Sequence, residues 1–152
     1  SQLTEIRRIK ARVETERLPQ AADPARHLKL GKGSISDVEW LVQLFQLRNA
    51  FHDSELRTLG TLEALGELES IGKVTKQEAQ TLRAAWLLAS RCRSALVLAV
   101  DKLVDILPAD RKQLEAMARI LEYAPGSASR LEEDYLSTTR KARAVYEKLF
   151  AQ

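Results

Sequence analysis

The sequence feature that most constrains this chain is a long stretch, from Thr75 to Leu107, that contains neither glycine nor proline. Apolar residues recur in it every three or four positions, which is the repeat of one face of an α-helix. At its start, Thr75-Lys-Gln-Glu78 has the form of a capping box, which favours a helix start. We therefore expect one long central helix, whose apolar stripe is Leu82, Trp86, Ala89, Cys92, Leu96, Ala99 and Leu103, widened by Leu88, Ala95 and Leu98.

Prolines and glycines cluster elsewhere in the chain, and the segments between the clusters show the same helical repeat. Two more capping boxes, Ser36-Asp-Val-Glu39 and Ser129-Arg-Leu-Glu132, predict helix starts, and Gly72 suits the left-handed end of a helix. No segment alternates with a period of two, so no sheet is expected. These patterns predict an all-α fold, a helical bundle of five or six helices with one long central helix. The shorter helices are expected over 2–18, 36–51, 58–71, 110–123 and from 129 nearly to the end.

Two of these shorter segments carry apolar residues that we expect to face the core. The first is basic and amphipathic, and Pro19 stops it. The second has two apolar faces and is expected to be buried on two sides. The expected core residues are Leu3, Ile6, Ile9 and Val13 in the first segment, and Val38, Trp40, Leu41, Val42, Leu44, Phe45, Leu47 and Phe51 in the second.

The composition is that of an ordinary globular domain, with 152 residues, 45% of them hydrophobic and 30% charged. A chain of this size buries about 70% of its unfolded surface and needs no disulfide or metal to fold. Cys92 is the only cysteine, so an intrachain disulfide is impossible and a cytoplasmic location is expected. No apolar run has the length of a membrane span and no signal peptide opens the chain, while Ser1 in place of a start methionine suggests a fragment of something longer.

The net charge of +3 raises the question of nucleic acid as a partner. Residues 1–33 contain eight lysines and arginines against four acids, so the excess positive charge lies at this end of the chain. Such a patch can hold a phosphate or two, but a solvated helix face explains it as well. Aromatic residues do not interleave with the basic ones, as base stacking requires, so nucleic acid is not expected as a partner. No membrane is expected as a partner either, because no apolar run is long enough to span one.

Most candidate catalytic residues have structural explanations. Cys92 falls on the apolar stripe of the central helix, where a small buried side chain is expected rather than a nucleophile. His27 and His52 flank a loop and a helix end, and each is expected to be a surface or capping histidine rather than a base or a ligand. Asp37 and Glu39 superficially resemble a magnesium-binding carboxylate pair. However, that pair requires a strand, and in the first turn of a helix residues i and i+2 diverge by about 200°.

The segment Gly31-Lys-Gly-Ser34 is a glycine-containing loop just before an expected helix N-terminus. Lys29 and Lys32 supply charge, and the helix N-terminus is expected to supply free N–H groups, so this edge suits an anion. A plain connecting loop with solvated lysines is the alternative interpretation.

The residues His27-Leu-Lys-Leu-Gly-Lys-Gly-Ser-Ile-Ser-Asp-Val-Glu-Trp-Leu-Val-Gln43 resemble a family signature. The signature follows each nucleotidyltransferase domain of glutamine synthetase adenylyltransferase, a bifunctional adenylyl-transferring and adenylyl-removing enzyme. Trp40 and Ser34 replace the usual Phe and Gly, which is similar to the actinobacterial branch. The later motifs are most similar to the C-terminal half of the family: Gln46-Leu-Arg48, Arg57-Thr58, Thr61–Leu65, Ala84–Arg91, Leu107–Arg111, Glu122-Tyr123, Gly126–Tyr135 and Arg140–Arg143.

The resemblance implies that this chain is a helical companion of a catalytic domain. Residues 1–26 are then a basic helix and linker that leave an absent nucleotidyltransferase domain, and 27–152 form the helical bundle domain. In the family the C-terminal half transfers AMP from ATP to a tyrosine of glutamine synthetase, so the resemblance implies that the parent uses ATP and magnesium. The implied partners are the chain's own catalytic domain, glutamine synthetase and a nitrogen-signalling regulatory protein. The residues expected to shape or border the nucleotide cleft are Lys29, Gly31, Lys32, Gly33 and Asp37.

The fragment alone is expected to contain no catalytic residue and no cofactor, because the strand-borne carboxylates of the family lie outside it. The alternative from another class is a stand-alone helical module that binds nucleic acid or protein through its basic N-terminal helix.

Overall fold

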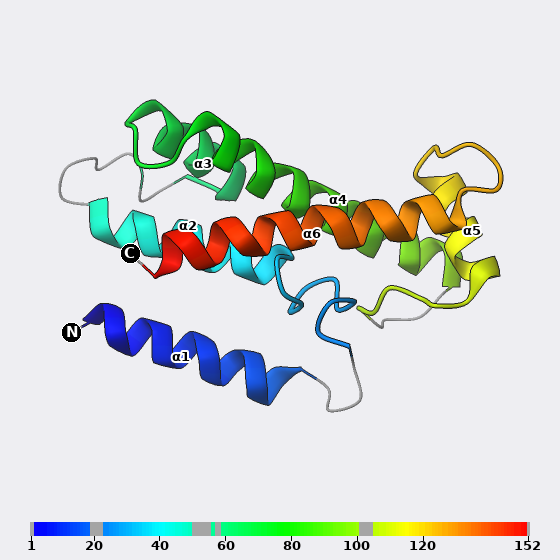
Figure 1. Ribbon diagram of the computed structural model, residues 1–152, viewed down its shortest axis with the longest axis horizontal. Helices are drawn as coiled ribbons and strands as arrows, with labels where there is room; N and C mark the ends of the chain where they lie inside the picture. Colours follow the sequence, from blue (N-terminus) through cyan, green and yellow to red (C-terminus); the bar gives the residue numbers. More distant parts are fainter. Residues whose placement is uncertain (1, 19–22, 50–55, 57–58, 101–104, 152) are drawn as a thin grey trace.

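The computed structural model describes residues 2–18, 23–49, 56, 59–100 and 105–151, and it is built from helices (Figure 1). This confirms the predicted all-α bundle. Among the described residues the only β-type pairing is an isolated antiparallel bridge between His27 and Ile106. The predictions for Phe51, His52, Arg57, Thr58 and Leu103 fall outside the described residues. The helices are α1 (Gln2–Arg17), α2 (Ile35–Asn49), α3 (Thr61–Ser70), α4 (Lys76–Val100), α5 (Arg111–Ile120) and α6 (Ala128–Phe150).

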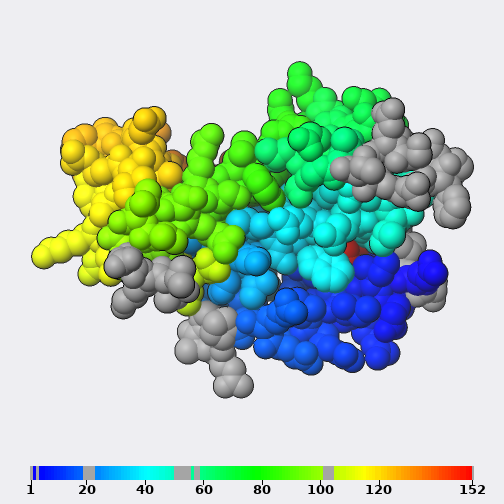
Figure 2. Space-filling view, turned by 180° about the vertical axis from the view of Figure 1, so that it is seen from behind, coloured from blue at the N-terminus to red at the C-terminus, as the bar shows by residue number. Residues whose placement is uncertain are grey.

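The two longest helices, α4 and α6, run antiparallel along the molecule, and the shorter ones pack at their ends (Figure 1). Helices α2 and α3 cover the end that holds the start of α4, and α5 covers the other end. Helix α1 lies along one side of this bundle, against α2, as Figure 2 shows from behind. None of the described helices has the length and apolarity needed to cross a bilayer.

Two clusters of buried apolar side chains form the core. The first lies among α2, α3, the start of α4 and the end of α6, and includes Leu41, Leu65 and Leu82. The second lies among the rest of α4, α5 and the start of α6, and includes Cys92 and Leu114. Trp86 packs against both clusters, but it is only partly buried, because its indole N–H reaches out to Glu39 at 3.4 Å.

Three apolar residues that were predicted to face the core are exposed instead: Ile9, Leu47 and Leu98. In α1 the face turned toward the bundle carries Ile6 and the buried Lys10, so Ile9 is displaced to one side. Leu98 is 74% exposed, since the buried stripe of α4 passes through Ala95 and Leu96.

One of the three predicted capping boxes is confirmed. Thr75 Oγ1 accepts from the Glu78 amide at 3.0 Å, and Glu78 Oε1 accepts from the Thr75 amide at 2.8 Å. The Gly72 prediction is also confirmed, with φ of +76° and an amide that donates to the Glu69 carbonyl. Helix α3 begins at Thr61, later than predicted, and α5 ends at Ile120, earlier than predicted.

The other two predicted capping boxes are wrong. Helix α2 begins at Ile35, so Ser36 lies inside its first turn and Glu39 turns to Trp86. Helix α6 begins at Ala128, so Ser129 lies inside its first turn. Glu132 pairs instead with Arg26 at 2.7 Å and with Arg111 at 2.8 Å. In both cases a tertiary partner takes the glutamate that the local pattern assigned to a cap.

Candidate functional site

The segment before α2 is held in place by pairing with the connection between α4 and α5. The Leu28 amide donates to the Asp105 carbonyl at 2.7 Å, and the Leu107 amide donates to the Arg26 carbonyl at 2.9 Å. His27 is buried within this segment, and its Nδ1 accepts from the Leu30 amide at 2.9 Å. Burial lowers the pKa of His27, so the neutral ring is favoured. His27 therefore caps a turn, as predicted, but does not lie at the surface.

Gly31 and Gly33 allow this segment to fold tightly on itself and onto α6. A Cβ on Gly31 would lie 2.3 Å from the His27 carbonyl oxygen and 2.5 Å from that of Pro24. Gly33 has φ of +75°, and a Cβ there would lie 1.8 Å from the Thr139 carbonyl oxygen. Both positions therefore require glycine for close backbone approach, which gives these residues a role in shaping the loop.

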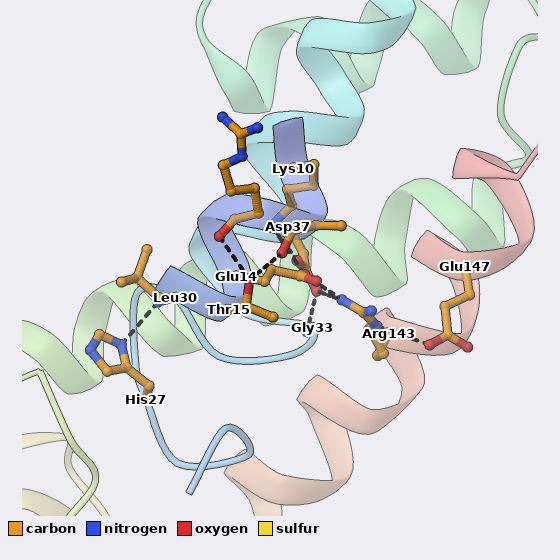
Figure 3. Close-up of polar contacts among 11 residues, drawn as sticks. Lys10, Glu14, Thr15, His27, Leu30, Gly33, Asp37, Arg143 and Glu147 are labelled. Atoms are coloured by element: carbon orange, nitrogen blue, oxygen red, sulfur yellow. Dashed lines mark hydrogen bonds and ion pairs between the residues drawn. The ribbon is translucent and has the colours of Figure 1, made fainter. Parts of the chain in front are cut away.

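Asp37 lies in the first turn of α2, fully buried, and binds three donors (Figure 3). Its carboxylate accepts from Lys10 Nζ at 2.9 Å, from Arg143 Nη1 at 2.8 Å and from the Gly33 amide at 2.6 Å. Glu39 instead accepts from Trp86, so the two carboxylates have different partners. Among the described residues no cluster of three or more His, Cys, Asp or Glu side chains is placed to hold a metal ion.

Asp37 is the centre of an ionic cluster, which we define as Lys10, Glu14, Asp37, Arg143 and Glu147 (Figure 3). Arg143 also donates to Glu14 and Glu147, each at 3.0 Å, and Lys10 lies 3.3 Å from Glu14. Burial acts to lower the pKa of Arg143, but the nearby carboxylates, chiefly that of Asp37, act more strongly in the opposite direction. The pKa of Arg143 therefore lies above its usual value. The cluster joins α1, α2 and α6.

Sequence reasoning missed Lys10, Glu14 and Arg143. It treated the basic residues of the first helix as a solvated face, but Lys10 is only 2% exposed. The available signal was a lysine placed one helical turn after Ile6, on the apolar face, with Glu14 one further turn along. Arg7 also turns inward, and its Nε donates to the Phe150 carbonyl at 2.8 Å.

Lys29 and Lys32 are both exposed, and neither forms an ion pair within the described chain. Lys32 lines a groove of about 570 Å³ between this segment and α6, whereas Lys29 lies outside the groove lining. The amides of Gly33, Ser34, Ser36 and Val38 donate to acceptors of the chain itself. The expectation of free N–H groups is therefore wrong for these four amides.

These features define a helical domain in which the signature loop, residues 27–34, is bound through the Gly33 amide to the buried, ion-paired Asp37. The family model described as GlnD PII-uridylyltransferase matches residues 6–150, and the chain belongs to this family.

More specific similarity is to bifunctional glutamine synthetase adenylyltransferase/adenylyl-removing enzymes, which confirms the resemblance found in the sequence. The relative from Leifsonia xyli subsp. xyli is 60% identical over 96% of this chain and 14% of its own length. Those from Mycobacterium marinum and Streptomyces avermitilis are 47% and 46% identical, each over 96% of this chain and 15% of their own length. The chain thus spans 14–15% of the length of these relatives.

Proposed function

We propose that this chain is a non-catalytic helical domain of a glutamine synthetase adenylyltransferase. In this role it supports the transfer of AMP from ATP to a tyrosine of glutamine synthetase, in the cytoplasm, as part of nitrogen regulation. Its partners are the catalytic nucleotidyltransferase domain of the parent enzyme, glutamine synthetase and a nitrogen-signalling regulatory protein. The parent requires ATP and magnesium, and residues 1–26 connect this domain to the catalytic one.

The observation that carries this proposal is the buried contact of Asp37 with Lys10 and Arg143. It fixes α1, the proposed connection to the catalytic domain, against the signature loop and α6. A connecting helix whose side chains are held in place gives the two domains that it joins a defined relative orientation. A flexible tether would not. Gly31, Gly33 and Asp37 then shape the loop, and Lys29 and Lys32 border the nucleotide cleft.

The same geometry argues against nucleic acid as the partner. Two of the basic residues of α1 point into the molecule, where Lys10 pairs with Asp37 and Arg7 donates to Phe150. They are not available to phosphates, so less charge remains on the surface of α1 than the sequence indicates.

The first test is the activity of the chain alone. Asp37 is held by Lys10, Arg143 and the Gly33 amide, and Glu39 accepts from Trp86, so the two carboxylates do not form a magnesium-binding pair. We therefore expect no transfer of AMP to glutamine synthetase with ATP and magnesium. The measurement is the appearance of radiolabel on glutamine synthetase from labelled ATP. Incorporation above a control without the chain would contradict the non-catalytic assignment.

The second test uses the parent enzyme that contains this domain. Lys29→Glu together with Lys32→Glu should lower AMP transfer about tenfold or more, because a repulsive charge replaces each favourable one near phosphate. The melting temperature should stay nearly unchanged, since both side chains are exposed. Lys112→Glu with Arg119→Glu on the exposed surface of α5 is the matched control. Unchanged transfer in the loop variant would leave the loop a plain connection, and equal losses in both variants would indicate diffuse electrostatics.

A further inference from the structure

The groove beside Lys32 has the size and position of a small-molecule site. One wall is formed by Asp23, Ala25, Arg26 and Lys32, and the other by α6 between Leu136 and Glu147. Its volume of about 570 Å³ falls within the range of about 300–1,000 Å³ that is typical of ligand pockets.

The charges that line the groove leave two cations without partners. Arg26 pairs with Glu132, which also pairs with Arg111, and Arg143 pairs with the three carboxylates of the ionic cluster. Lys32 and Arg140, one on each wall, are exposed and form no ion pair with any described residue. Two uncompensated cations that face the same space favour an anionic ligand.

The two carboxylates of the groove lining cancel only part of this preference. Asp23 accepts from the Ala25 amide at 2.9 Å, which leaves its negative charge in the groove, and Glu147 accepts from Arg143 at 3.0 Å. Against these two carboxylates the lining carries four cations, Arg26, Lys32, Arg140 and Arg143, so its net charge is +2. Leu136 and Ala144 add an aliphatic surface on the α6 side. The groove thus combines a cationic rim with an apolar wall, an arrangement that suits a ligand with a charged end and a flat, weakly polar body.

We propose that this groove binds a nucleoside phosphate, with the phosphates between Lys32 and Arg140 and the nucleoside against Leu136 and Ala144. The choice of a nucleoside among organic phosphates rests on the proposed function. The lining residues of the site all lie within this 152-residue chain, which therefore binds the nucleotide without a catalytic domain. This assignment gives Arg140, on α6, a phosphate-binding role beside Lys32 of the signature loop.

The test is titration calorimetry of the chain with ATP, and with inorganic tripolyphosphate as the probe that lacks a nucleoside. We expect saturable ATP binding that is about tenfold or more tighter than tripolyphosphate binding, since the apolar wall contacts only the nucleoside. Lys32→Glu with Arg140→Glu should weaken ATP binding about a hundredfold, which is tenfold for each reversed charge.

The matched control is Lys112→Glu with Lys141→Glu. Lys141 follows Arg140 on α6 but lines a different cavity, beside Thr75 and Glu78. This variant should keep the affinity for ATP, and circular dichroism should show all variants folded. Absence of saturable ATP binding, equal affinity for tripolyphosphate, or an equal loss in the control variant would each overturn the assignment.

Failure of the groove and failure of the proposed function give different results. ATP binding by the chain, combined with unchanged AMP transfer when Lys29 and Lys32 are reversed in the parent, supports the groove and contradicts the role of the loop in transfer. No ATP binding by the chain, combined with impaired transfer in that variant, overturns the groove and supports the proposed function.

Discussion

At the scale of single residues, Gly33 sets the distance between the signature loop and α6. Replacement by alanine should lower the free energy of unfolding by about 2–5 kcal/mol, which combines left-handed backbone strain of ~1–2 with overpacking of ~1–3 kcal/mol. The overpacking arises because the new Cβ would meet the Thr139 carbonyl. Urea denaturation of the variant and the parent chain measures the difference.

Gly126 provides the matched control, because its φ is +81° but nothing lies within 4 Å of the position that a Cβ would occupy. Gly126→Ala should therefore cost only the backbone strain of about 1–2 kcal/mol. Equal losses at the two positions would show that close packing on α6 does not constrain the loop.

His27 gives the chain a pH-dependent stability. Its pKa is lowered from 6.5 in the folded state, chiefly by burial, so below this pH the unfolded chain takes up a proton that the folded chain does not. Stability should therefore fall as the pH is lowered from about 7.5 to about 5.5. His27→Asn keeps an acceptor for the Leu30 amide and should lose less stability over this window in urea melts at each pH. An identical pH profile in both chains would contradict the assignment.

Cys92 should be unreactive in the folded chain. The side chain is fully buried, and burial raises the pKa of its thiol to about 12, so almost no thiolate forms near neutral pH. An aromatic disulfide reagent at about pH 8 should modify it only after denaturant is added. Rapid modification without denaturant would show that the second core cluster opens readily.

At the scale of helices, the capping boxes differ in what they contribute. Thr75→Ala removes an observed cap of α4 and should lower the free energy of unfolding by about 1 kcal/mol. Ser129→Ala should change it by less than about 0.5 kcal/mol, because Ser129 lies inside α6 and only accepts from exposed Arg111. Denaturant melts of the two variants measure both changes in unfolding free energy. A larger loss of stability in Ser129→Ala than in Thr75→Ala would contradict a start of α6 at Ala128.

The helices could be predicted from the sequence because a repeat of three or four residues is a local property. Helix starts were less predictable, since a pattern such as Ser129-Arg-Leu-Glu132 also suits a helix interior when Glu132 has Arg26 as a partner. The exposure of Lys29 and Lys32 followed from their loop composition. The ionic cluster could not be predicted, because no spacing in the sequence indicates that Lys10 and Arg143 both contact Asp37 in the folded chain.

At the scale of the whole molecule, the ionic cluster holds α1 on the bundle. Asp37→Ala would leave Lys10 and Arg143 without their central carboxylate, which should cost about 3–5 kcal/mol of unfolding free energy. Lys10→Met should cost less, since Asp37 keeps Arg143 and the Gly33 amide. Urea denaturation measures both. Similar small losses in the two variants would show that apolar contacts, such as that of Ile6, hold α1 instead.

The pairing of Asp37 with Arg143 joins residues that are 106 positions apart. A chain emerges from the ribosome with its N-terminal side first, so α1 and the signature loop emerge long before α6. Until residue 143 has been translated, Asp37 lacks one of its two cations and Gly33 lacks the Thr139 backbone that it packs on. The loop is therefore among the last parts of this domain to reach its final form, although it is synthesised well before α6, which completes it.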